Sequence, residues 1–295
     1  MKRKSYISLC LSMIIFGTIG IFVVNIPASR PFVALVRGSV GALFLFVAAL
    51  VTGKRPSLVD IKRNLLPLLV SGAFIGFNWI LLFESYKYAS VAASTLIYYL
   101  SPVFVIILAA IFLGEKITLL RALLALTAVF GMVLISGTGS GSLLALGAAL
   151  LYALVVLINK RFIRDISSLD TTIMQLGFAS LSILPYVLLT ENVFSYRFTL
   201  TDGLLLVLLG AVHTGLAYLL YFTAVKGLKG QTVAIVSYLD PTVAVILSFI
   251  IEKSFTPTVL VGAIIIIASA ILSELYGDKK INANKKQSKN KNAES

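Results

Sequence analysis

The stretch that decides the fold covers residues 88–114 and reads YASVAASTLIYYLSPVFVIILAAIFLG. It carries no charged residue, and it is longer than the roughly 20 apolar residues that a helix needs to cross a bilayer. Other charge-free runs follow along the chain: 5–29, 64–83, 122–159, 171–190, 203–225 and 254–273. This pattern predicts an all-α polytopic membrane protein, because a transmembrane β-barrel would show short alternating segments instead.

The composition of the whole chain agrees with this interpretation. Of the 295 residues, 59% belong to the hydrophobic set and 13% are charged, whereas soluble domains have about 45–50% and about 25%. These values exclude a soluble enzyme, a disordered protein and a disulfide-stabilised scaffold. Cys10 is the single cysteine, and we interpret it as a small buried apolar residue of the first span.

The arrangement of apolar runs and turn residues predicts ten transmembrane helices, with ends accurate to a few residues. We expect the spans 6–24, 31–51, 65–85, 90–112, 118–136, 142–159, 170–190, 203–223, 230–250 and 257–275. The positive-inside rule tests this count. With a cytoplasmic N-terminus, the inner segments carry 20 Lys and Arg residues and the outer segments carry four, while Arg37 lies within a span. This bias predicts that both termini are in the cytoplasm, and it explains the net charge of +13 without nucleic acid.

An internal repeat becomes visible when the chain is shifted by 139 residues. Tyr99-Leu100-Ser101-Pro102 then aligns with Tyr238-Leu239-Asp240-Pro241, and Lys87 aligns with Lys226. Five helices per repeat is an odd number, so the second copy enters the membrane from the opposite side. Inverted repeats are typical of secondary transporters, which bind substrate near the midplane between the halves. We expect residues 1–136 to form the first repeat, 137–276 the second, and 277–295 a basic, disordered cytoplasmic tail.

A set of motifs spread over residues 5–275 points to a family. The motifs are Ser94-x6-Ser101-Pro102-Val103, Gly114-Glu115, Gly131, Tyr238-Leu239-Asp240-Pro241, Gly262 and the intramembrane Arg37. They resemble the drug/metabolite transporter superfamily, and within it the EamA-like transporters built from two five-helix repeats. The first span differs from the family, because Phe16-Gly17 stands where a Trp-Gly pair is common. The resemblance implies transport of small metabolites without ATP, often as export.

Asp240 is the strongest candidate for a functional side chain. It lies near the middle of the ninth span and directly precedes Pro241, which removes a backbone hydrogen bond and kinks the helix. An ionised group at the bilayer centre costs about 2.5–3.5 kcal/mol on insertion scales, so it needs a reason. We expect Asp240 to bind a proton that drives substrate movement. The alternative is a hydrogen bond to a backbone group that the proline frees.

Two further polar residues lie within the predicted spans. At 1.5 Å per residue, His213 lies roughly 21 Å from the turn at 227–228, and Asp240 lies roughly 18 Å from the same turn. At this similar depth the two can relay protons, or His213 can be a buried histidine bonded to a carbonyl. Arg37 can attract an anionic group of the substrate, pair with Asp240, or extend to the interface.

Aromatic and amide side chains complete the predicted binding site, because such groups stack on and hydrogen-bond to small polar metabolites. The candidates are Tyr99 and Tyr238, each three residues before a proline, together with Asn78, Trp79 and Tyr98. The alternative for aromatic residues is an anchor at the interface. We expect Ser101, Pro102 and Pro241 to mark helix breaks, and Glu84 and Glu115 to be interfacial.

We predict neither a metal site nor a cofactor. His213 has no second ligand at helical spacing. The glycine- and serine-rich run 137–142 lacks the Gly-Lys-[Ser/Thr] of a phosphate-binding loop, so ATP hydrolysis is not expected.

The sequence thus predicts a secondary transporter that carries a small organic metabolite or drug across the cytoplasmic membrane by alternating access, as an exporter. Proton coupling is one mode, and a proton-independent facilitator or exchanger is the alternative. A membrane-embedded enzyme acting on lipids would need clustered carboxylates or histidines, and a non-transporting scaffold would need a soluble signalling domain or partner. The expected partners are the substrate, membrane lipids and protons.

Overall fold

The computed structural model describes residues 2–114 except 24 and 90, residues 140–240, and scattered single positions between 119 and 268. Within these residues the chain is helical and contains no strand. Seven helical segments are long and apolar enough to cross a membrane: Arg3–Val23, Arg30–Val51, Leu65–Ser85, Ser94–Leu113, Gly141–Arg161, Ser168–Thr190 and Leu200–Gly227. The protein is therefore an all-helical, multi-pass membrane protein. Of the predicted spans 118–136 and 257–275 only isolated positions are described, and the span 230–250 is described continuously as far as residue 240.

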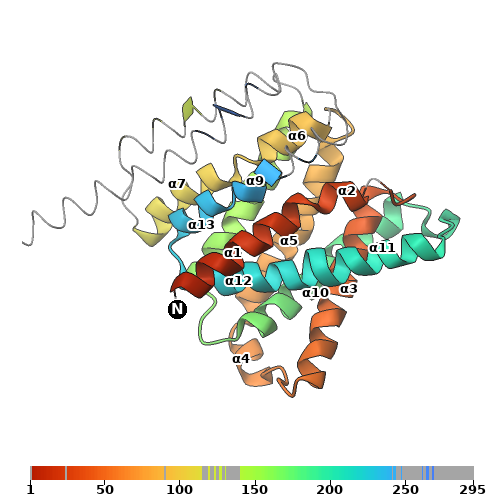
Figure 1. Ribbon diagram of the computed structural model, residues 1–295, viewed down its shortest axis with the longest axis horizontal. Coiled ribbons are helices and arrows are strands. Elements are labelled where there is room, and N and C mark those ends of the chain that lie inside the picture. Colours follow the sequence, from red (N-terminus) through yellow and green to blue (C-terminus); the bar gives the residue numbers. More distant parts are fainter. Residues whose placement is uncertain are drawn as a thin grey trace, which may run out of the picture.

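Within 2–114 and within 140–240, the helices follow one another with short connections (Figure 1). The first half contains α1 (Lys2–Gly17), α2 (Ile19–Val23), α3 (Arg30–Val51), α4 (Leu58–Arg63), α5 (Leu65–Ser85), α6 (Val91–Tyr98) and α7 (Ser101–Leu113). The second half contains α9 (Ser140–Arg161), α10 (Ser168–Thr190), η1 (Val193–Ser195), α11 (Leu200–Gly210), η2 (Ala211–Leu216), α12 (Ala217–Gly227) and α13 (Gly230–Val236).

Several predicted spans are not single regular helices. The first is interrupted at Thr18, between α1 and α2, and the fourth is interrupted at Tyr99 and Leu100, between α6 and α7. The second interruption directly precedes Ser101 and Pro102, as expected from a proline that has no N–H to donate to the preceding turn. The eighth span is a longer rod in which α11 and α12 are joined by the wider π-helical turn η2.

Two glycines bring α5 and α10 into close contact. A Cβ atom at Gly76 would lie 2.7 Å from the carbonyl oxygen of Ala179, and one at Gly72 would lie 2.8 Å from that of Gln175. Side chains larger than hydrogen do not fit at these two positions. Small residues four apart are how membrane helices approach each other without a hydrophobic driving force.

A second close crossing joins α3 to the turn η2 (Figure 1). A Cβ atom at Gly41 would lie 2.9 Å from the carbonyl oxygen of Gly210 and 3.0 Å from the backbone nitrogen of Gly215. The backbones thus touch where the eighth span changes from α- to π-helical geometry. His213 lies within this turn.

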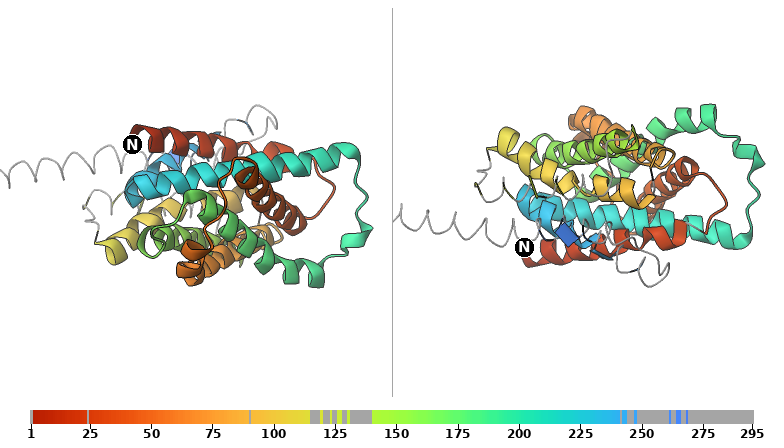
Figure 2. Two further views of the ribbon diagram at one scale, coloured as in Figure 1. Left: turned by 90° about the horizontal axis from the view of Figure 1, so that it is seen from below. Right: turned by 90° about the horizontal axis from the view of Figure 1, so that it is seen from above.

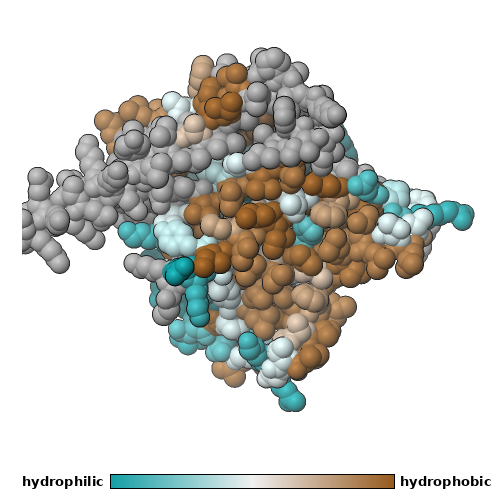
Figure 3. Space-filling model, viewed as in Figure 1, coloured by the Kyte–Doolittle hydropathy of each residue, from teal (hydrophilic) through white to brown (hydrophobic). Residues whose placement is uncertain are grey.

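The outer surface of the bundle suits a lipid environment. Hydrophobic side chains cover much of the face formed by α1, α3 and α12, and hydrophilic residues gather at its margins (Figure 3). Large apolar side chains are exposed there, including Leu43, Phe44 and Val47 of α3. The N-terminus and the connection between α10 and α11 lie at opposite ends of the bundle (Figure 2).

The α5–α10 contact yields a stability prediction. We expect Gly76→Leu to lower the apparent melting temperature of the detergent-purified protein, because overpacking of a tight contact costs about 1–3 kcal/mol. Gly177→Leu on α10 is the matched control, since nothing lies within 4 Å of a Cβ atom there. Equal melting temperatures for the two variants would contradict the close packing at Gly76.

Candidate functional site

Arg37 of α3 lies at the centre of a buried aromatic group. Its guanidinium carbon is 4.3 Å from the ring centroid of Trp79 on α5, a distance at which the ring face attracts a cation. The Trp79 ring meets Tyr218 of α12 edge-on at 6.1 Å, and Phe16 of α1 meets the same tyrosine at 5.0 Å. Arg37 is 9% exposed and Trp79 is 4% exposed, so Arg37 does not extend to the interface.

A chain of tyrosines continues from this group. Tyr221 of α12 lies 6.0 Å from Tyr152 of α9, which lies 6.0 Å from Tyr98 of α6. The Tyr98 hydroxyl donates a 3.5 Å hydrogen bond to Asn78 Oδ1, and Asn78 Nδ2 donates a 2.5 Å bond to the carbonyl oxygen of Ala148. We use the name central cluster for these residues: Phe16, Arg37, Asn78, Trp79, Tyr98, Tyr152, Tyr218 and Tyr221.

Asp240 lies at the edge of the central cluster. Its half-buried side chain lies in the same region of the bundle as Tyr98, Tyr99 and Tyr218. Its backbone passes close to α1, because a Cβ atom at Gly17 would lie 2.7 Å from the Asp240 carbonyl oxygen. Pro241, the expected cause of the break, is outside the described residues.

His213 has other partners than the predicted ones. Its Nε2 lies 3.0 Å from the Thr18 hydroxyl, and its Nδ1 lies 3.5 Å from the carbonyl oxygen of Leu208. Its ring also packs on Phe22 at 4.8 Å. Within the described residues, Asp240 forms no ion pair with His213 or with Arg37. The arrangement matches the alternative of a buried histidine bonded to a carbonyl.

The remaining predicted site residues lie at the helix interruptions. Tyr99, Ser101 and Tyr238 are all buried, and the Tyr99 ring is 6.3 Å from Tyr98. The Tyr238 hydroxyl has no hydrogen-bond partner within the described residues. Tyr99 is therefore buried next to Tyr98 of the central cluster.

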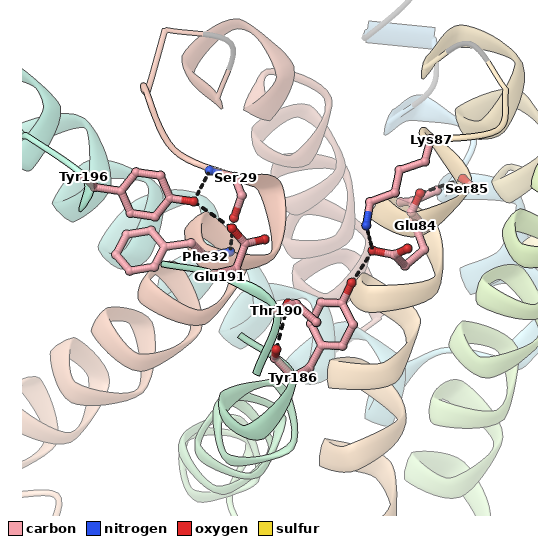
Figure 4. Close-up of polar contacts among 10 residues, drawn as sticks. Ser29, Phe32, Glu84, Ser85, Lys87, Tyr186, Thr190, Glu191 and Tyr196 are labelled. Carbon is pink, nitrogen blue, oxygen red and sulfur yellow. Dashed lines mark hydrogen bonds and ion pairs between the residues drawn. The ribbon is translucent and has the colours of Figure 1, made fainter. Parts of the chain in front are cut away.

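A polar network closes one end of the bundle (Figure 4). Glu84 at the end of α5 forms a 2.7 Å ion pair with Lys87 and accepts a hydrogen bond from the Tyr186 hydroxyl of α10. The bond to Glu84 raises the pKa of Lys87 above its usual value. We use the name Glu84 latch for these three residues. Glu84 thus lies near a helix end, as expected, and also connects two helices.

Beside this latch, a second set of bonds ties the α10–α11 connection to α3. The Tyr196 hydroxyl donates a 2.9 Å hydrogen bond to Glu191 Oε2 and accepts a 3.2 Å bond from the backbone nitrogen of Ser29. Ser29 in turn caps α3, because its hydroxyl accepts from the backbone nitrogen of Phe32.

Sequence reasoning missed several residues of the site. Phe16 was noted only as a departure from the family motif, and Tyr152, Tyr218 and Tyr221 were not singled out. A usable signal did exist for Tyr218 and Tyr221, since they lie three residues apart in the second half of the eighth span and therefore share a helix face.

Comparisons with known proteins identify the class to which this fold and cluster belong. The model of the EamA-like transporter family matches the chain twice, at residues 3–137 and 139–275. The chain therefore belongs to the EamA-like transporter family. This confirms the resemblance to the drug/metabolite transporter superfamily that the motifs indicated.

Individual relatives agree with this assignment. The uncharacterized transporter YxxF of Bacillus subtilis (strain 168) is 31% identical, over 95% of this chain and 93% of its own length. Protein RarD of Escherichia coli (strain K12) is 26% identical, over 73% of this chain and 74% of its own length. A crystal structure with 19% identity superposes with a TM-score of 0.76 and covers 93% of this chain and 99% of its own, which supports the fold.

The Glu84 latch yields a prediction of coupling. We expect Glu84→Gln and Tyr186→Phe each to lower the apparent melting temperature, because a hydrogen bond to a charged group contributes about 1.5–3 kcal/mol at most. The double variant should lose less stability than the sum of the two single losses, since Glu84→Gln weakens the charge-assisted bond that Tyr186→Phe removes.

Tyr196→Phe is the control for this double-mutant cycle. It also removes a tyrosine hydroxyl, but from the set of bonds between the α10–α11 connection and α3. Its effect should add to that of Glu84→Gln. Additive effects for Tyr186→Phe and Glu84→Gln would show that the Tyr186 hydroxyl does not bind Glu84.

Proposed function

We propose that the protein is a secondary transporter that moves a small organic metabolite by alternating access, with the central cluster as its binding site. The observation that carries this proposal is the composition of that cluster. Helices of the first half supply Phe16, Arg37 and Trp79, and helices of the second half supply Tyr152 and Tyr218. Substrate sites of inverted-repeat transporters lie at such an interface between halves.

We propose further that the chain has ten transmembrane helices in two inverted repeats, 1–136 and 137–276, followed by the tail 277–295. The two successive matches to one family model support this division. So do the helix interruptions, because α6 ends just before Tyr99 and α13 ends two residues before Tyr238, its partner in the repeat. Both interruptions lie within the protein, where broken helices are tolerated.

The ends of the bundle supply candidate gates. At one end, the Glu84 latch ties α5 to α10. At the other, Lys160 of α9 donates to the carbonyl oxygens of Val225 and Leu228, and Lys226 of α12 donates to that of Ile166. Alternating access requires one set of bonds to open while the other stays closed. The surface-accessible polar bonds suit this role, since water can replace them at low cost.

The second end also supports the predicted orientation. It gathers the connections that carry most of the basic residues, since Asn64 exchanges hydrogen bonds with the backbone of Arg164 and Gly227 lies against Ser5 near the N-terminus. We propose that this end faces the cytoplasm, in keeping with the positive-inside rule. A transporter in this orientation in the cytoplasmic membrane can act as the exporter that the family resemblance implies.

We propose proton coupling through Asp240, with proton-independent exchange or facilitated diffusion as the second candidate. Asp240 is a half-buried acidic residue in the region of Tyr98 and Tyr218. His213 is held by Thr18 instead and is assigned no part in the relay. The family and its relatives favour a transporter over a lipid-modifying enzyme or a scaffold.

The coupling proposal predicts the behaviour of Asp240→Asn. Proteoliposomes that contain a pH indicator would be challenged with panels of amino acids, monocarboxylates, amines and nucleosides. We expect at least one compound to change the internal pH with the wild-type protein and not with Asp240→Asn. Transport of that compound, followed with a radiolabel, should become independent of an imposed pH gradient.

Asp165→Asn is the matched control. Asp165 is an exposed loop residue with a φ of 53°, a conformation that asparagine also adopts. This variant should keep the pH-gradient dependence. Gradient-driven transport at the original rate in Asp240→Asn would refute the coupling role, and absence of any transport across the panel would refute the proposed function.

The topology predicts the location of the C-terminus. A green fluorescent protein fused after residue 295 should fluoresce in bacterial cells, because this reporter folds in the cytoplasm. An alkaline phosphatase fused at the same position should be inactive. The opposite pair of results would show an uneven number of spans or a periplasmic N-terminus.

A further inference from the structure

Arg37 is a buried cation that lacks a counter-charge. Within the described residues, its side chain forms no hydrogen bond and no ion pair, and its Nε is shielded without a partner. Within the part of the chain that the structure describes, the carboxylates that form ion pairs are Asp165 and Glu84, and neither pairs with Arg37. A buried charge without a partner is strongly unfavourable, so the protein keeps this one for a purpose other than stability.

The contact with Trp79 satisfies only part of the guanidinium. The indole covers one face of it at 4.3 Å, which offsets some of the charge through the ring quadrupole. The N–H donors, however, point along the edge of the plane, and among them the buried Nε has no acceptor within the described residues. A carboxylate matches this edge, because its two oxygens can accept two parallel hydrogen bonds.

The surroundings of Arg37 restrict the ligand further. Trp79 and Phe16 each meet the ring of Tyr218, and the three rings provide faces and edges against which a planar ring can pack. Asp240 lies at the edge of the same cluster, so a second negative charge on the ligand would meet repulsion. One cation therefore fits one anionic group.

We propose that the substrate is a small organic monocarboxylate with a planar ring, whose carboxylate binds Arg37 and whose ring packs among Trp79, Tyr218 and Phe16. This inference rests on the proposed function, because it names the substrate class of that site. The cluster is closed in the described arrangement, so the ligand enters when the helices around Arg37 separate.

The site contains its own probe, because Trp79 is the single tryptophan of the chain. The detergent-purified full-length protein would be titrated with benzoate while the tryptophan emission is recorded. We expect a saturable change with benzoate. Benzylammonium and benzyl alcohol, which keep the ring but lack the carboxylate, should give none. Acetate, which lacks the ring, and phenyl phosphate, which carries a second charge, should bind more weakly than benzoate.

Two arginine variants test the assignment to Arg37. Arg37→Lys keeps the charge but loses the planar guanidinium, whose parallel N–H groups can bind both oxygens of a carboxylate. We expect this variant to weaken benzoate binding by about tenfold or more. Arg63→Lys makes the same change at an exposed position, 70% accessible, and should bind like the wild type. Should Arg37→Lys fail to fold, the ligand panel on the wild-type protein decides the question.

The outcomes separate the substrate class from transport itself. Equal binding of benzoate, benzylammonium and benzyl alcohol would overturn the proposal, as would unchanged benzoate binding in Arg37→Lys. Transport of amines or nucleosides by a protein that does not bind benzoate would overturn the substrate class and leave the proposed function standing. Benzoate binding without transport of any compound would support the site and refute the transporter.

Discussion

The absence of water in the bilayer core is the constraint on which this structure depends. Each backbone N–H and C=O inside the hydrocarbon must find a partner within the protein. Regular helices meet this requirement on their own, so the backbone groups that an interruption frees must be surrounded by protein rather than lipid. The interruptions at Thr18 and at Tyr99–Leu100 both lie among packed helices. The hydroxyl of Thr18 bonds to the carbonyl oxygen of Ile15 in α1 and to Nε2 of His213 in the eighth span.

The same constraint explains why polar and aromatic groups gather in one place. The neighbouring helices that enclose an interruption also exclude lipid from the space between them. Arg37, Asn78 and the tyrosines can occupy that space because no hydrocarbon reaches it. Trp79 supplies a π face for the guanidinium, and the carbonyl of Ala148 holds the amide of Asn78.

Much of the fold could be predicted from the sequence. Four predicted spans nearly coincide with observed helices: 31–51 with α3, 65–85 with α5, 142–159 with α9 and 170–190 with α10. They agree because an apolar run of bilayer length satisfies its backbone hydrogen bonds by forming one continuous helix. The pairing of His213 could not be predicted. Depth along a helix follows from residue count, whereas the direction of a side chain depends on rotation, and the π-helical turn changes that rotation locally.

Some residues of the candidate site could likewise be predicted from the sequence, and others could not. Arg37, Asn78, Trp79 and Tyr98 were recognisable because each is a polar or aromatic residue within a span. Tyr152 was not, since an isolated tyrosine in a helix looks the same whether it faces lipid or a neighbouring helix. The link between Glu84 and Tyr186 joins residues 102 positions apart, and no local pattern encodes such a contact.

The crossing of α3 over η2 has a mechanical consequence. Backbone meets backbone at Gly41, Gly210 and Gly215, and the side chains of Val40, Phe44 and Thr214 pack against the same glycines. This interlocked contact makes α3 and η2 a single mechanical unit, so a displacement of η2 is passed on to α3. Arg37 lies about one helical turn from the contact on α3, and His213 lies within η2 itself. The buried cation and the histidine would therefore move together relative to the rest of the bundle.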